Sequence, residues 1–345
     1  TVNFGEGGPE AERAMNLGLD LSLWGDRTSF TVNYFNLKTE DMLVYVPQQS
    51  YTGFTLLPVN SGNVKNTGFE IIASQLILDK PAFKWNIIPA LSFLSNEVKW
   101  MDGRELVTPF EGGEFVTREG NPVNSFYGYQ FKGVFATAED ALEADLVSAT
   151  GTPFGAGDAI YKDLSGPENI PDGMINDYDK VTLGSPIPDC FGSLLNTFKF
   201  HRWSLDFMIR FVYGNDIFNY VRYRNESMVD LSNQSTNVLK RWQYGSNVTD
   251  VPRALWNDPV GNSDFSSRWI ENGSYLQLKY LTLGYTIPDK LLVFKNAAFY
   301  FTATNLFTIN EYLGYHPEFS YSVDPMEQGI DYGLMPQFRQ FLFGI

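Results

Sequence analysis

The chain has 345 residues, a net charge of −15, one cysteine and two histidines. So acidic a chain lacks the basic face that nucleic acid requires, and Cys190 alone forms neither a disulfide nor a thiolate metal site within the chain. Because His201 and His316 are the only histidines, the composition also disfavours a histidine-based triad or a zinc centre, and we predict no enzymatic activity.

Aromatic residues make up 16% of the chain, yet the mean hydropathy is −0.20. This combination indicates alternation of apolar and polar residues. No stretch approaches the ~18 uninterrupted apolar residues of a membrane helix. If the chain spans a membrane, it must do so as a closed barrel, because lipid leaves no other partner for the backbone groups of strands.

The N-terminal sequence TVNFGEGGPE has neither the basic nor the apolar region of a secretory signal. A protein that is exported needs such a signal. We therefore expect that Thr1 is not the natural start and that the chain is a piece of a longer protein.

The first predicted element is a hairpin over 14–24 and 27–37. Leucines at 17, 19, 21 and 23 alternate with polar residues and glycine, and Phe30, Val32 and Tyr34 alternate likewise after the turn Gly25-Asp26. Because successive strand side chains point to opposite faces, this pattern predicts one apolar and one polar side.

The run 203–213 repeats this alternation and is bracketed by Trp203 and Tyr213. A barrel strand needs ~9–11 residues to cross a membrane and carries aromatic residues at both interfaces. In the run 275–285 the phase slips, because Leu278 and Leu281 are an odd number of residues apart. This slip predicts a β-bulge near Tyr280-Leu281, or two buried faces.

About ten segments of barrel length are predicted in all. They lie at 14–24, 27–37, 66–78, 83–95, 126–135, 191–200, 203–213, 274–286, 297–308 and 337–345. Short turns join some pairs, whereas the polar segments 97–125, 136–190, 214–273 and 309–336 join others. This asymmetry is typical of outer-membrane barrels with long extracellular loops. The alternative is a soluble β-sandwich, whose strands are usually shorter.

Several stretches, in order along the chain, are similar to transporters of the SusC/RagA family. They include NLGLDLSLWGDRTSFTVNYFNLKTEDML (16–43), NSGNVKNTGFEI (60–71), SFYGYQFKGVF (125–135), DGMINDYDKVTLGSPIPDCFGSLLN (172–196), FVYGNDIFN (211–219), NQSTNVLKRWQ (233–243), SSRWIENGSYLQLKYLTLGYTIP (266–288) and YFTATNLFTINEYLGYHPE (300–318). Together these matches cover nearly the whole chain.

The resemblance implies an all-β, antiparallel transmembrane β-barrel of 22 strands with an N-terminal plug domain. Residues 1–345 would be its C-terminal part of about ten strands, without the plug and the first barrel strands. The implied protein lies in the outer membrane of a Gram-negative cell and imports oligosaccharides or peptides. Its implied partners are a SusD-type surface lipoprotein as a lid, TonB through the plug, and outer-membrane lipid. No cofactor is required for this activity.

Two other functions stay open at this point. A transporter-like barrel could act as a structural component of a larger outer-membrane or secretion assembly. A soluble carbohydrate-binding β-domain is the third interpretation. The sequence does not distinguish a glycan from a peptide substrate.

The segment 172–179, DGMINDYD, resembles the second half of an EF-hand calcium loop. Calcium takes six to eight oxygen ligands, which closely spaced Asp and Asn residues supply. The first half fits poorly, because Ile170 falls at a ligand position. The predicted ligands are Asp163, Asp172, Asn176 and Asp179. The alternative is a solvated acidic turn.

Four loop residues are candidates for contact with substrate or partner: Trp242, Trp256, Arg268 and Tyr321. Aromatic faces suit both sugar rings and peptides. Arg268, with Trp269 and Glu271, precedes a predicted strand. Its alternative role is a structural cap in which the guanidinium pairs with a carboxylate inside the barrel.

Overall fold

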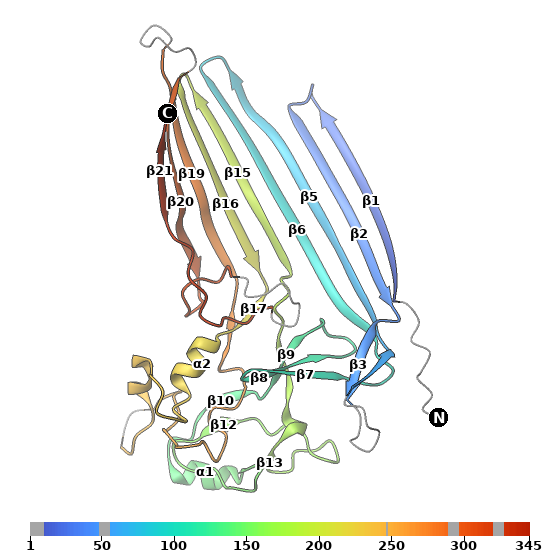
Figure 1. Ribbon diagram of the computed structural model, residues 1–345, viewed down its shortest axis with the longest axis vertical. Helices are drawn as coiled ribbons and strands as arrows, with labels where there is room; N and C mark the ends of the chain where they lie inside the picture. The colour runs from blue at the N-terminus through green and yellow to red at the C-terminus, as the bar shows by residue number, and fades with distance from the viewer. Residues whose placement is uncertain (1–9, 48–55, 246–247, 289–296, 320–327) are drawn as a thin grey trace.

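The computed structural model describes residues 10–47, 56–245, 248–288, 297–319 and 328–345. In these ranges one large antiparallel sheet stands on a folded module that gathers at one of its ends (Figure 1). We call the sheet the wall. Its strands follow the chain order: β1 (Ala11–Leu23), β2 (Thr28–Glu40), β5 (Asn63–Lys80), β6 (Phe83–Trp100), β15 (Cys190–Phe200), β16 (Trp203–Tyr213), β19 (Tyr275–Thr286), β20 (Ala298–Asn310) and β21 (Gln340–Gly344).

Nine of the ten predicted barrel segments lie in the wall. The prediction for 126–135 is wrong, because this run forms β9 (Ser125–Gly128) and β10 (Phe131–Val134) in the module. All four residues of β9 are buried, so both of its faces pack against protein. Alternation of aromatic residues alone does not separate such a strand from one with a lipid-facing side.

The wall has an apolar and a polar face, as the hairpin pattern predicts. Cross-strand pairing places Leu19 opposite Val32, and Val32 opposite Ile71. Large apolar side chains of this face are exposed in the structure: Leu17, Leu19, Phe69, Phe93, Phe200, Trp203, Tyr213, Phe299, Phe307 and Phe341. On the other face hydroxyl groups bond across strands, as from Thr31 to Asp20 at 2.6 Å.

No helix in the described part of the chain is both long and apolar enough to cross a membrane.

The predicted bulge in β19 is present. The pairing of β19 with β16 shifts between Leu278 and Tyr280, so that Lys279 is the extra residue there. In the pairing with β20, Asn305 and Leu306 both lie opposite Lys279. On one side of the shift Leu278 lies opposite Ile209, and on the other Leu281 lies opposite Phe207. The bulge therefore keeps all the leucines of β19 on the apolar face, and the alternative of two buried faces is wrong.

The two ends of the wall differ in their connections. Short turns at 24–27, 81–82 and 201–202 join β1 to β2, β5 to β6 and β15 to β16. At the opposite end the connections are long and span 41–62, 101–189, 214–274 and 311–339. The first contains the hairpin of β3 (Leu43–Pro47) and β4 (Leu56–Asn60). In an outer-membrane barrel the long connections lie outside the cell.

The long connections are not simple loops. Residues 101–189 and 214–274, which we call the module, fold into small sheets and helices. The largest sheet joins β14 (Val181–Gly184), β9, β8 (Gly113–Thr117) and β7 (Leu106–Phe110). Further pairs join β10 with β12 (Ala159–Tyr161), β11 (Val147–Ser148) with β13 (Met174–Ile175), and β17 (Asp216–Phe218) with β18 (Ile270–Asn272). The helices are α1 (Ala138–Ala144), α2 (Tyr220–Glu226), η2 (Asp177–Asp179) and η3 (Thr236–Lys240).

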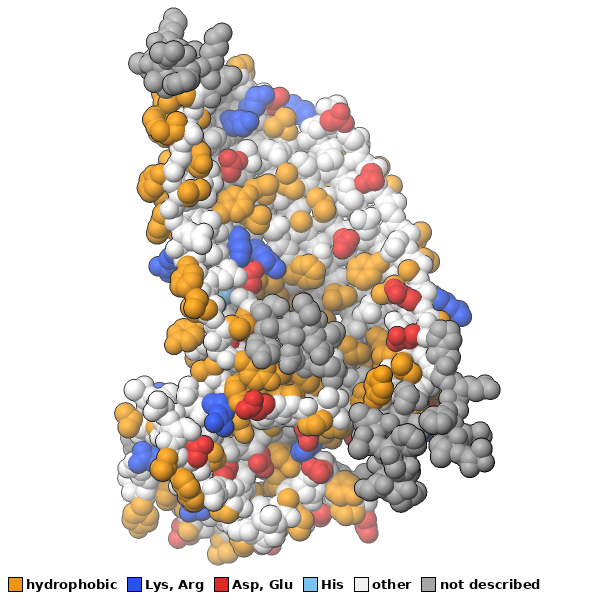
Figure 2. Space-filling view, in the orientation of Figure 1, with side chains coloured by type: hydrophobic (Ala, Val, Ile, Leu, Met, Phe, Trp, Pro, Cys, Tyr) orange, Lys and Arg blue, Asp and Glu red, His pale blue; other side chains and the backbone are white. Residues whose placement is uncertain are grey.

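The module has apolar cores of the kind found in water-soluble proteins. One core centres on Phe115, Phe126, Phe218 and Trp269, each at most 1% exposed. Phe115 and Phe126 stack at 5.2 Å between ring centroids. Figure 2 shows how the wall differs, because hydrophobic side chains stand uncovered along its left margin, over β20 and β21.

Candidate functional site

Helix α2 carries two members of a network of buried charged side chains, Arg222 and Glu226. The side chain of Asn219 caps its N-terminus by accepting a bond from the Arg222 backbone N–H at 2.9 Å. Arg222 donates from Nε to Glu226 Oε2 at 3.2 Å and from Nη1 to Glu271 Oε1 at 3.0 Å. All three charged side chains are largely buried, so the charges compensate one another within the module.

Arg268 packs behind this network and does not face an open cavity. Its guanidinium lies 4.3 Å from the centre of the Trp269 ring. The Nη2 atom is 4.0 Å from Glu226, too far for a hydrogen bond. Burial and the nearby Arg222 lower the pKa of Arg268 to about 10. The structure thus places the residue in the module core and not in the barrel interior.

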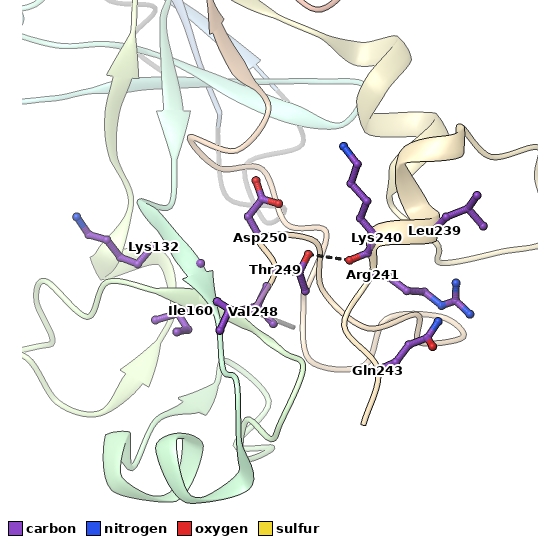
Figure 3. A pocket seen from close by; sticks show the side chains of 11 residues that line it. Lys132, Ile160, Leu239, Lys240, Arg241, Gln243, Val248, Thr249 and Asp250 are labelled. Atoms are coloured by element: carbon purple, nitrogen blue, oxygen red, sulfur yellow. Dashed lines mark hydrogen bonds between the residues drawn. The ribbon is translucent and has the colours of Figure 1, made fainter. Parts of the chain in front are cut away.

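The module contains a cavity of about 820 Å³ between β10, β12 and the chain that follows η3 (Figure 3). Six of its lining residues are Lys132, Ile160, Lys240, Arg241, Thr249 and Asp250. Figure 3 shows Lys132 and Lys240 on opposite sides of Asp250 and Thr249. The Thr249 hydroxyl donates to the Lys240 carbonyl at 2.7 Å, which fixes this part of the cavity wall.

A second cavity of about 500 Å³ shares Lys240 with the first. It lies between α2, η3 and the segment 313–315, and Arg222 and Glu226 contribute to its lining. The Glu226 carboxylate is already engaged by Arg222, by Asn237 at 2.9 Å and by Ser235 at 3.3 Å. The Glu226 and Arg222 side chains of this second cavity are therefore already engaged within the protein.

A separate ion cluster lies on the polar face of the wall. Glu318, from the connection between β20 and β21, accepts bonds from Arg210 of β16 at 2.5 Å and from Lys279 of β19 at 2.8 Å. Burial alone raises the pKa of Glu318, but Lys279 and Arg210 outweigh it and hold the pKa below its usual value. His316 hydrogen-bonds Gln277 beside this cluster, and burial lowers the pKa of its imidazole. This connection therefore folds back onto the wall.

The residues of the predicted calcium loop hold the loop together. Asp179 is fully buried, and its carboxylate accepts bonds from the backbone N–H of Leu164 at 2.7 Å and of Asn176 at 2.9 Å. Asp163 accepts from the Gly173 N–H at 2.8 Å, and Asp172 from the Met174 N–H at 3.0 Å. The Asn176 side chain caps η2.

The described residues hold no group of three or more His, Cys, Asp or Glu side chains arranged to bind a metal ion. Asp163 Oδ1 is buried without a hydrogen-bond partner. Calcium binding at this loop stays a prediction.

The three remaining candidates have different surroundings. Trp242 donates from its indole to the Ala136 carbonyl at 2.9 Å, and its ring packs on Gly157. Trp256 is 62% exposed. Tyr321 lies outside the described residues. Arg268, Trp242 and Trp256, the candidates within the described residues, thus have different surroundings, and their role in binding stays a prediction.

Sequence reasoning missed the lining of the larger cavity. Lys132, Lys240 and Arg241 come from two distant segments and match no motif. The sequence gives only an indirect indication of this site, because cations are outnumbered by carboxylates in this acidic chain.

Comparison with known proteins gives one consistent result. No protein-family model matches the chain. Two curated relatives from Formosa agariphila, TonB-dependent receptors P3 and P26, are each 29% identical to it. The matches cover 97% of this chain and 34% of each relative, so the chain spans about a third of their length.

Solved structures agree on the fold. A chain of the RagAB peptide transporter superposes with a TM-score of 0.76 at 22% identity, covering 97% of this chain and 35% of that one. The RagAB peptide importer in its open-open state gives 0.75 at 22% identity, with coverage of 96% and 34%. The wall is therefore a partial β-barrel, with its apolar face toward lipid and its polar face toward the interior. The chain is homologous to the TonB-dependent receptors and forms part of an outer-membrane β-barrel.

Proposed function

We propose that this chain supplies part of the barrel and the outer rim of a TonB-energised importer of nutrients. The substrate is an oligosaccharide or a peptide, and a SusD-type surface lipoprotein covers the barrel as a lid. TonB acts through a plug domain elsewhere in the receptor. No covalent chemistry on the substrate is expected.

The two-faced wall is the observation that supports this proposal most strongly. Its apolar face suits lipid, and its polar face carries Arg210, Lys279 and Glu318, which suit a water-filled interior. The folded module at the end with long connections contains cavities. The chain superposes on part of the RagAB peptide importer with a TM-score of 0.75, and its curated relatives are named TonB-dependent receptors.

Uptake by living cells tests the proposal. In a strain that lacks the receptor, labelled oligosaccharides and peptides should no longer enter, and the complete receptor should restore uptake. Dissipating the inner-membrane proton gradient should abolish this uptake, because TonB draws its energy there. Purification of the receptor should bring down one lipoprotein in equal amount.

A role as a structural part of a larger assembly predicts a different outcome. In that case several surface proteins should co-purify with the receptor, and uptake of every labelled nutrient should survive its loss.

Calcium at the loop 163–179 is a subsidiary prediction. Titration of the complete receptor with Ca²⁺ should raise its thermal unfolding temperature, and Asp172→Asn should remove this increase. An unchanged unfolding temperature in excess Ca²⁺ would identify the segment as a turn stabilised by its own hydrogen bonds.

A further inference from the structure

The larger cavity of the module has a charge opposite to that of the chain. The chain carries 25 Lys and Arg against 40 Asp and Glu, whereas the cavity lining has Lys132, Lys240 and Arg241 against Asp250 alone. No ion pair joins any of these three cations to a carboxylate within the described residues. This differs from α2, where Arg222 has two carboxylate partners.

The cations stand on separate parts of the cavity wall. Lys132 belongs to β10, whereas Lys240 ends η3 and is followed by Arg241. Figure 3 shows the two lysines on either side of the cavity, with the Arg241 side chain directed away from both. The Lys132 side chain extends outward in this view as well, so the three cations stand around the rim of the cavity, where together they raise the positive potential that an anion would meet.

We propose that this cavity binds an acidic oligosaccharide, one whose sugar units carry carboxylate or sulfate groups. The proposal rests on the proposed function and narrows its substrate class. The volume of about 820 Å³ lies within the range of ligand pockets. Ile160 and Val248 provide apolar surface for the C–H faces of sugar rings.

The lining favours an acidic glycan over the two other substrates. A neutral sugar typically stacks on an aromatic face, and the described lining of this cavity contains no aromatic residue. A peptide is commonly anchored by side chains that enter separate apolar pockets. Here the aliphatic residues share one broad cavity with the cations.

Equilibrium binding to the complete receptor tests the assignment, with a hexauronate as the probe. A neutral hexasaccharide and hexaglutamate serve as comparison ligands. Wild-type receptor should bind the hexauronate most tightly, and rising sodium chloride should weaken this binding severalfold. The double variant Lys132→Gln/Lys240→Gln should lose about tenfold in affinity, since each exposed ion pair contributes modestly.

Control variants separate charge from folding. Lys80 lies on the wall, far along the chain from the cavity. The control variant Lys80→Gln should therefore leave hexauronate binding unchanged. Lys132→Arg/Lys240→Arg keeps both charges and should retain most of the affinity. Equal binding by the wild type and the double glutamine variant would overturn the proposal. So would tighter binding of the neutral hexasaccharide or of hexaglutamate, or no binding of hexauronate.

Failure of the two proposals can be told apart. If cells import a neutral glycan or a peptide in a TonB-dependent manner but the receptor does not bind hexauronate, only the substrate assignment fails. If hexauronate binds through the two lysines but the receptor supports no energised uptake, the import function fails and the binding site stands.

Discussion

The wall and the module differ in how they place large aromatic residues. Trp203, at the end of β16, is 49% exposed on the apolar face, whereas Trp269 in the module is fully buried. One chain thus contains a region adapted to lipid and a region adapted to water. The difference shows that the exposed apolar residues of the wall face lipid and do not indicate poor packing.

The comparison also locates where specificity can reside. The wall repeats one simple pattern, in which pairs such as Leu205 and Leu283 lie opposite each other on the lipid side. The module instead has cavities, capped helices and paired buried charges. Binding groups are therefore expected mainly in the module, and the wall acts as the rigid scaffold that positions the module.

The largest effect is expected from removing the central aromatic side chain of the module. Trp269→Ala should lower the stability of the module by about 3–5 kcal/mol, because it leaves a cavity beside Tyr223. The substitution also removes the aromatic ring on which the buried Arg268 guanidinium packs. Hydrogen exchange of β9 and β18 in the complete receptor would measure this. Trp203→Ala is the matched control, and equal loss of protection in both variants would contradict the distinction between the two regions.

A charge on the lipid side should cost somewhat less than the loss of Trp269. Ile209→Arg, near the middle of β16, should destabilise the barrel by about 2–4 kcal/mol. The neighbouring Met208 points to the polar face, so Met208→Arg should have little effect. The measurement is the folded fraction in lipid vesicles across a urea series. If Met208→Arg proved the more damaging variant, the two faces would have to be exchanged.

A smaller effect is expected where the connection 311–339 returns to the wall. Glu318→Gln removes the charge that Arg210 and Lys279 share and should weaken this contact by about 1–3 kcal/mol. Hydrogen exchange at 313–318 should then become faster. Glu311→Gln is the control, because that carboxylate accepts only a long bond, of 3.4 Å, from Asn272 among the contacts described. Unchanged exchange in Glu318→Gln would show that other contacts hold the connection.

The smallest effect concerns pH. Burial raises the pKa of Asp216 in β17, so the folded module holds this proton more strongly than the unfolded chain does. The stabilising contribution of the protonated form is present at low pH and is lost as pH rises from about 4, the unfolded value, through the folded one. Asp216→Asn should flatten this part of the stability curve. A stability curve that is the same for wild type and Asp216→Asn would contradict this role of burial.

Sequence reasoning predicted the wall better than the module for a physical reason. Lipid imposes a strict alternation on strands such as 203–213, and the predicted limits of that strand are those observed. Even the odd spacing of Leu278 and Leu281 indicated the bulge. In the module, by contrast, short strands such as β9 are buried on both faces, so alternation does not identify their surroundings.

The candidate sites were hardest to predict, because they depend on tertiary contacts. Lys132 and Lys240 are more than one hundred residues apart, and only the folded module brings them to one cavity. Arg268 was predicted to contact substrate or partner, and that role stays a prediction. Its nearest carboxylate, Glu226, comes from α2, a helix that the alternation of the neighbouring strands does not predict.

The bulge in β19 has a consequence for how such a strand can change. With Lys279 deleted, Leu278 and Leu281 would fall an even number of residues apart, and pairing with β16 could run without interruption. The lipid side would be complete in that shortened strand, so the extra residue is not required by the membrane. What the deletion would remove is the ammonium group that holds Glu318. Local irregularity is thus the means by which a repetitive barrel strand presents one additional charged side chain on its polar face.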